Sequence, residues 1–172
     1  MRYLILLISA LLIFSCHKHD HDEDHDHDHK DDKHHGHAHD EDGNCVHEAP
    51  NGGSMISYGN DFAFIEFLLD NKTGTMTAFI YAGHSVTPQK IKDETITLNL
   101  ASGEEKNQLI LKPEVSELTK NKVGDSSKFV GQSDWLKGKE KFDIWVEPVT
   151  IKGVKQKQVH FVFPDASKAH TH

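Results

Sequence analysis

The sequence predicts an all-β domain over residues 51–165, either an Ig-like β-sandwich or a small antiparallel barrel of about 7–8 strands. Short runs rich in β-branched and aromatic residues are separated by clusters of Gly, Asn, Asp and Pro. Apolar and polar residues alternate within these runs, as where Phe142 and Ile144 flank Asp143. No long segment has helical periodicity, so strands are expected to build the whole core.

Turn residues divide this region into strands. The first strand is expected at 54–58 and a shorter one at 127–130, with a single helical turn at 133–136. Three hairpins are expected because Asn and Gly supply the conformations that tight turns need. Their strand pairs are 62–70 with 75–82 around 71–74, 94–100 with 107–112 around 101–103, and 141–151 with 154–163 around Lys152 and Gly153. Residues 166–172 are expected to form a flexible C-terminal tail.

Residues 1–15 predict a targeting segment. A basic start at Arg2 precedes an apolar run over 3–14, which is shorter than the ~20 residues of a membrane-spanning helix. The segment Ile13-Phe14-Ser15-Cys16 resembles the lipobox of bacterial lipoproteins, whose cysteine is lipid-modified and becomes the first residue of the mature protein. This resemblance implies acyl chains such as palmitate on Cys16. It also implies a location in the cell envelope, at the bacterial outer membrane and facing the periplasm or the surface.

A histidine- and acid-rich tract follows directly. Residues 17–42 hold ten histidines and eleven acidic residues, with Ala38 as the one apolar side chain, so this tract is expected to be disordered. Imidazole is the commonest protein ligand for borderline divalent metals, and carboxylates add oxygen donors and negative potential. Many overlapping donor sets predict several labile sites, for zinc first and for copper or nickel as alternatives. The predicted ligands are His17, His19, His21, His25, His27, His29, His34, His35, His37 and His39, together with Cys45 and His47 just beyond the tract.

Two other interpretations of the tract stay open. Histidines with an unperturbed pKa near ~6.5 exchange metal for protons toward pH ~5, so the tract can instead respond to pH. It can also be a solvated acidic spacer.

Charge and motifs exclude several function classes. Residues 17–42 carry three lysines against eleven acidic residues, a net charge of −8, whereas residues 43–172 carry fifteen against sixteen, a net charge of −1. Nucleic-acid binding is therefore not expected, because it needs a basic surface. The chain has no Gly-rich phosphate loop, no G-x-S-x-G and no H-E-x-x-H, so we expect no enzyme. With Cys16 used as the anchor, Cys45 has no partner for a disulfide.

A second resemblance covers most of the folded region. Its matching residues are His47, Gly52-Gly53, 66–70 followed by Thr73-Gly74, Tyr81 and 124–129. In these residues the chain resembles small bacterial extracytoplasmic proteins in which a His-rich leader precedes Gly-Gly and a β-rich domain. Related segments accompany periplasmic adaptor subunits of heavy-metal efflux systems. The resemblance implies a β-rich fold and a metal transporter or efflux adaptor as the partner.

Further candidates lie outside the tract. Cys45 and His47, one residue apart, have a spacing at which a thiolate and an imidazole can share a metal. His170 and His172 form a minimal H-x-H, an auxiliary metal site. The remaining candidates are His84 in a loop, His160, which alternation turns outward between Val159 and Phe161, and the tryptophans Trp135 and Trp145, expected as core or edge aromatics or as a stacking platform.

Together these features predict four segments: a signal peptide at 1–15, an anchor and disordered metal-binding tract at 16–50, a β-domain at 51–165 and a tail at 166–172. The predicted function is that of a cell-envelope lipoprotein that binds or buffers divalent transition metal for efflux or uptake. The alternative is a protein- or polymer-binding β-module that the tract spaces from the membrane.

Overall fold

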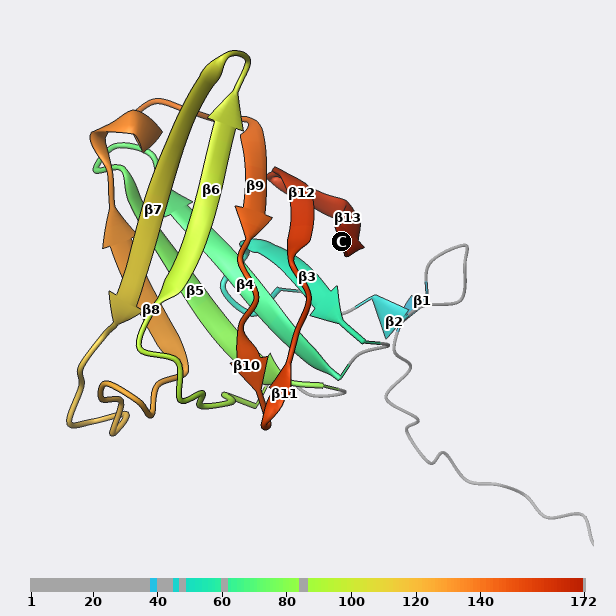
Figure 1. The fold of residues 1–172 in the computed structure, drawn as a ribbon, viewed down its shortest axis with the longest axis vertical. Helices are drawn as coiled ribbons and strands as arrows, with labels where there is room; N and C mark the ends of the chain where they lie inside the picture. Colours follow the sequence, from blue (N-terminus) through green and yellow to red (C-terminus); the bar gives the residue numbers. More distant parts are fainter. Residues whose placement is uncertain (1–37, 40–44, 47–48, 60–61, 84–86, 172) are drawn as a thin grey trace, which may run out of the picture. The chain divides into compact units, whose positions relative to one another are not determined.

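A computed structural model describes residues 38–39, 45–46, 49–59, 62–83 and 87–171 (Figure 1). Its strands are β1 (Ala38–His39), β2 (Cys45–Val46), β3 (Ser54–Tyr58), β4 (Ala63–Asp70), β5 (Thr75–Ala82), β6 (Ile96–Ser102), β7 (Glu105–Pro113), β8 (Lys128–Gln132), β9 (Phe142–Val146), β10 (Thr150–Ile151), β11 (Val154–Lys155), β12 (Val159–Phe163) and β13 (Asp165–Thr171). One short 3₁₀ helix, η1, spans Asp134–Leu136.

Nine of the strands form a single antiparallel sheet. Their order is β13-β12-β9-β6-β7-β8-β5-β4-β3, and the pairs β1-β2 and β10-β11 form separate two-stranded ladders. The sheet curls until its edge strands β3 and β13 lie beside each other (Figure 1). The hydroxyl of Ser54 in β3 donates a hydrogen bond to the carbonyl oxygen of Pro164, just before β13 (2.7 Å). The predicted all-β fold is confirmed, in its barrel form.

Alternating side chains fill the barrel. In β9 Phe142, Ile144 and Val146 are buried, whereas the residues between them are partly exposed. The same alternation in β12 buries Val159 and Phe161, each with 1% of its surface exposed. Burying one apolar side chain contributes about 1.5–3 kcal/mol, so these inward rows supply the main stabilisation of the sheet.

All three predicted hairpins are present. Strands β4 and β5 pair from Ala63↔Ala82 to Asp70↔Thr75, and β6 and β7 pair up to Ser102↔Glu105. In the third hairpin β9 pairs with β12, and the ladder β10-β11 closes its tip. Lys152 and Gly153 there have φ of 50° and 77°, the left-handed conformation that a two-residue type I′ turn requires at both positions.

The structure departs from the predicted elements at two places. The strands predicted at 141–151 and 154–163 are interrupted, and Pro148, which has no N–H to donate, lies in the gap between β9 and β10. The flexible tail predicted at 166–172 is wrong for residues 166–171, because β13 pairs with β12 there. The turn predicted at 133–136 is confirmed as η1, with the Ser133 side chain accepting a hydrogen bond from the Trp135 N–H.

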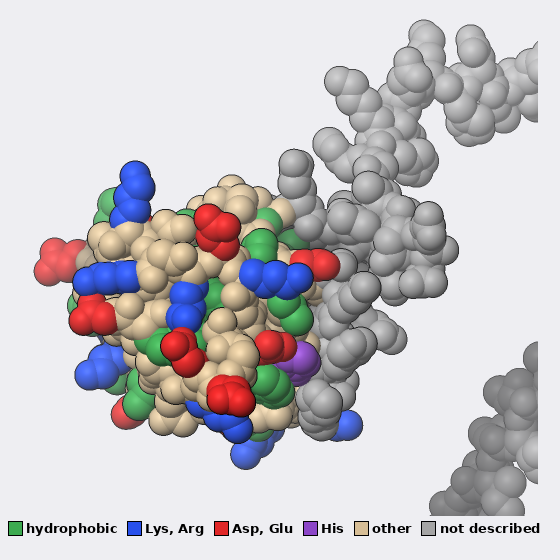
Figure 2. All heavy atoms as spheres, turned by 90° about the horizontal axis from the view of Figure 1, so that it is seen from above, with side chains coloured by type: hydrophobic (Ala, Val, Ile, Leu, Met, Phe, Trp, Pro, Cys, Tyr) green, Lys and Arg blue, Asp and Glu red, His purple; other side chains and the backbone are tan. Residues whose placement is uncertain are grey.

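Lysines and acidic side chains are interspersed on the face of the barrel seen in Figure 2, as the nearly balanced charge of residues 43–172 leads one to expect. None of the described residues belongs to a helix with the length and hydrophobicity that crossing a bilayer demands.

Candidate functional site

Two of the predicted metal ligands lie in the short ladder that precedes the barrel. Strands β1 and β2 are antiparallel, and His39 and Cys45 are direct Cα partners. Residues directly opposite in such a pair lie on one face with Cβ atoms about 4.5–5.5 Å apart. The backbone therefore brings Cys45 to a tract histidine, a partner that the sequence spacing to His47 did not indicate.

The predicted lipidation site Cys16 and most of the other predicted metal ligands lie outside the described residues. These ligands and candidates are His17, His19, His21, His25, His27, His29, His34, His35, His37, His47, His84 and His172.

The chain that follows this ladder is fastened to the barrel by a buried carboxylate. Glu66, in the middle of β4, has 0% of its surface exposed. Its Oε1 accepts hydrogen bonds from the backbone N–H groups of Asn51 (2.8 Å) and Gly53 (2.9 Å). Its Oε2 accepts from the Asn51 side-chain amide (2.8 Å) and from the hydroxyl of Tyr81 (2.9 Å). All four partners are donors, as an acceptor-only carboxylate requires, so the burial is fully compensated.

This network also accounts for the presence of glycine at position 53 and for the raised pKa of Tyr81. A Cβ atom on Gly53 would lie 2.5 Å from the carbonyl oxygen of Phe67, so only glycine permits this close approach of the backbone to β4. Burial, and then the hydrogen bond to the Glu66 carboxylate, raise the pKa of Tyr81 well above its usual value. The sequence signal for this network is a single glutamate within the apolar run 62–69.

On the outer face of the barrel, polar and aromatic residues line up across the strands β7, β6, β9 and β12, and β13 pairs next to β12. Cα partners join Gln108 on β7 to Asn99 on β6, Asn99 to Trp145 on β9, Trp145 to His160 on β12, and His160 to His170 on β13. The rings of Trp145 and His160 stack with centroids 4.4 Å apart and an interplanar angle of 22°. The Gln108 amide donates to the Asn99 side-chain oxygen (2.9 Å). We call Gln108, Asn99, Trp145 and His160 the outer row.

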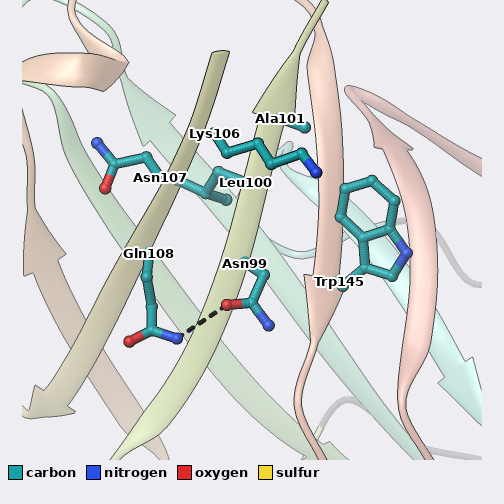
Figure 3. Close-up of a pocket in the computed structure, with 7 residues that line it drawn as sticks. All are labelled: Asn99, Leu100, Ala101, Lys106, Asn107, Gln108 and Trp145. Atoms are coloured by element: carbon teal, nitrogen blue, oxygen red, sulfur yellow. Dashed lines mark hydrogen bonds between the residues drawn. The ribbon is translucent and has the colours of Figure 1, made fainter. Parts of the chain in front are cut away.

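An open hollow of about 570 Å³ lies at one end of the outer row (Figure 3). Asn99, Lys106, Asn107, Gln108 and Trp145 contribute to its walls. In Figure 3 the indole of Trp145 stands on one side and the amides of Asn99 and Gln108 on the other. An aromatic plane beside amides and an ammonium can stack against a ring and hydrogen-bond to its substituents.

His160 faces outward, as alternation predicted, with a carboxylate beside its ring. Its Nε2 lies 2.8 Å from Oδ1 of Asp143. The other tryptophan, Trp135, packs partly buried against the core, edge-on to Phe142, with the Lys139 ammonium 4.2 Å from its ring centroid. Of the two tryptophans, only Trp145 lines the hollow on the outer face.

Among the side chains that the structure describes, no three or more histidine, cysteine or acidic groups gather where they could hold a metal ion. In comparisons with known proteins, no family model matches the chain, and no curated protein or solved structure matches it significantly. The resemblances to lipoproteins and to efflux-associated segments therefore stay predictions.

Proposed function

We propose that this protein binds and buffers divalent transition metal, zinc foremost, at the cell envelope. The tract of ten histidines and eleven acidic residues carries the proposal, because it offers donors in number where no packing requirement explains them. Metal is held in several labile sites, and the lipid anchor at Cys16 keeps them at a membrane surface. A metal transporter or efflux adaptor would receive or supply the ions.

The register of β1 and β2 supports a thiolate-containing site at the end of the tract. His39 and Cys45 are Cα partners in this ladder, and an imidazole and a thiolate are ligands of the kinds that zinc takes. The hydrogen bonds of Glu66 support a role for the barrel in anchoring the chain that follows the tract. It fixes the chain at Asn51 and Gly53, so the residues just before them leave the domain from a defined point.

Isothermal titration of the full chain with Zn²⁺ tests the proposal. A variant with all ten tract histidines replaced by glutamine keeps the acidic charge and is the matched control. We expect the parent to bind several ions and the control to lose most of that heat, with parent binding weakening from pH ~7 toward ~5 as imidazoles take up protons. Equal heats in the two proteins would contradict metal binding by the tract and leave it an acidic spacer.

Replacing Cys45 by serine tests the thiolate separately. We expect the number of bound ions to stay nearly the same and the tightest class of sites to weaken, because one thiolate ligand is lost. Unchanged affinity in every class would show that Cys45 takes no part.

The hollow at Trp145 favours a second candidate function, in which the barrel binds an envelope polymer and the tract only spaces it from the membrane. Cosedimentation with insoluble cell-wall glycan compares the parent with Trp145→Ala and with a deletion of residues 17–42. A polymer-binding module keeps its binding after the deletion and loses it with Trp145→Ala. A metal-handling protein shows no binding that depends on Trp145.

A further inference from the structure

The hollow beside Trp145 exists because one short side chain lies among longer ones. Ala101 on β6 is a direct Cα partner of Lys106 on β7 and of Asp143 on β9. Asp143 points outward, since it alternates with buried residues of β9, and directly opposite residues share a face of the sheet. Ala101 therefore lies on the outer face, where its methyl group leaves open a space that a larger side chain would fill (Figure 3).

The walls of this hollow are held in place by contacts of their own. The imidazole of His160 stacks on one face of the Trp145 indole, and the indole surface that it leaves uncovered lines the hollow. The side-chain amide of Asn99 donates to Oε1 of Glu147 (2.6 Å), and its oxygen accepts from the amide of Gln108 (2.9 Å). A ligand therefore meets side chains that are already ordered, which lowers the entropic cost of binding.

Two side chains of the hollow keep hydrogen-bonding capacity for a ligand. The exposed ammonium of Lys106 makes no hydrogen bond or ion pair with any residue that the structure describes, and in Figure 3 its side chain runs across β6 in the direction of Trp145. The carbonyl oxygen of the Gln108 side chain likewise accepts from none of the described residues. The hollow thus offers both donors and an acceptor beside an aromatic ring.

The charges on the two sides of Ala101 balance each other. Lys106 carries a positive charge on one side and Asp143 a negative charge on the other, so the position favours neither an anion nor a cation. A hydroxyl group both donates and accepts hydrogen bonds, as the amides and the ammonium here require. The apolar C–H face of a sugar ring can pack on an indole, whose plane is a large apolar surface.

From this arrangement we propose that the hollow binds an uncharged pyranose unit of a glycan chain, with the ring against Trp145 and its hydroxyls hydrogen-bonded to Gln108 and Lys106. The proposal rests on the second candidate function and deepens it, because it names the class of polymer. Sites for small molecules bury most of the ligand, whereas this hollow is open, so the neighbouring units of a chain can continue over the sheet.

The indole N–H signals of the ¹⁵N-labelled full chain test this proposal. The neutral probes are the hexasaccharides of glucose and of N-acetylglucosamine, and the charged comparison is the hexasaccharide of galacturonic acid. We expect a neutral probe to shift the Trp145 signal saturably and to leave the Trp135 signal unchanged, because Trp135 packs against the core and does not line the hollow. Trp145→Phe assigns the two signals.

Three variants, each checked for folding by its urea midpoint, locate the ligand. Ala101→Leu fills the hollow and should abolish the shift at probe concentrations that saturate the parent. Thr97→Leu is the matched control, because it adds a leucine on the same strand and face outside the hollow, and it should bind as the parent does. Lys106→Met keeps the length of the side chain without the charge and should weaken binding about threefold.

The proposal is overturned if no neutral probe gives a saturable shift, if a folded Ala101→Leu protein binds as the parent does, or if the galacturonic acid probe binds more tightly than both neutral ones. Each of these results leaves the second candidate function standing wherever cosedimentation with insoluble glycan still depends on Trp145. The hollow contains no residue of the tract, so the metal binding proposed for the tract is tested independently.

Discussion

Replacing Glu66 by glutamine tests the buried network that fastens the chain to the barrel. The substitution keeps the volume of the side chain and one carbonyl oxygen, which can still accept from the N–H groups of Asn51 and Gly53. The other oxygen becomes an amide NH₂ and faces two donors, the side-chain amide of Asn51 and the hydroxyl of Tyr81. Tyr81 can rotate its proton away, whereas the Asn51 amide loses the carboxylate as an acceptor and keeps only the Tyr81 hydroxyl (2.8 Å).

The expected magnitude follows from these four contacts. Hydrogen bonds to a charged group contribute about 1.5–3 kcal/mol and neutral ones about 0.5–1.5, so the two retained bonds lose about 2 kcal/mol together. The two lost bonds to the charged group cost about 3 kcal/mol more. Relief from burying a charge offsets about 2 kcal/mol of this total. The net loss is therefore about 3 kcal/mol, which corresponds to a fall of about 10 °C in Tm for a domain of this size.

Urea unfolding followed by tryptophan fluorescence measures this loss, since Trp135 packs against the core and Trp145 lies in β9. The matched control is Glu105→Gln on β7, where the exposed carboxylate makes a surface ion pair with Lys139 (2.9 Å). We expect the control to change the free energy of unfolding by less than about 1 kcal/mol. A Glu66→Gln protein as stable as the control would refute the reasoning, because the carboxylate would then contribute nothing that an amide cannot.

Three further outcomes are expected. Gly53→Ala should destabilise the barrel by about 1–3 kcal/mol in urea unfolding, because its Cβ would lie 2.5 Å from the carbonyl oxygen of Phe67. Gly52→Ala is the control variant, because nothing lies within 4 Å of a Cβ atom added there and only the positive φ of 73° disfavours alanine. An equal loss of stability in the two variants would argue against the steric cause. Tyr58→Phe should stabilise the barrel by about 1 kcal/mol, because the buried hydroxyl has no hydrogen-bond partner among the described residues, and a lower Tm would contradict this. Burial raises the pKa of Tyr58 and, with the hydrogen bond to Glu66, that of Tyr81. Above the unfolded pKa near ~10 the unfolded chain releases these protons before the folded chain does, so the free energy of unfolding is unaffected below that pH and falls as pH rises above it. The urea midpoint should therefore fall above pH ~10, and less steeply in Tyr58→Phe; an unchanged slope would show that this tyrosine does not carry the effect.

The parts of the fold that the sequence predicted are those encoded locally. Alternation of Phe142, Ile144 and Val146 predicts which face of β9 is buried, and the dipeptide Lys152-Gly153 predicts a turn. β13 was missed because residues 165–171 show no apolar alternation, and the strand is specified by hydrogen bonds to β12.

The candidate sites depend on register, which residue type alone does not determine. His160 was correctly predicted to face outward, but its pairing with His170 depends on an irregular register between His160 and Val162. Glu66 entered the sequence analysis only as the first residue of the segment 66–70 that carries the second resemblance, since its burial requires the chain at Asn51 and Gly53 to fold over it. For the tract, by contrast, the composition alone predicts metal binding, and no strand register is needed for that prediction.

Because the edge strands β3 and β13 lie beside each other, the order of the strands along the chain can be changed by circular permutation. The hydrogen bond from Ser54 to Pro164 joins residues 110 positions apart and brings the first and last strands of the barrel together. Proteins with adjacent domain ends commonly tolerate circular permutation. A short linker between β3 and β13, with new ends opened at the exposed Lys152-Gly153 turn, should give a barrel with the same order of strands in the sheet.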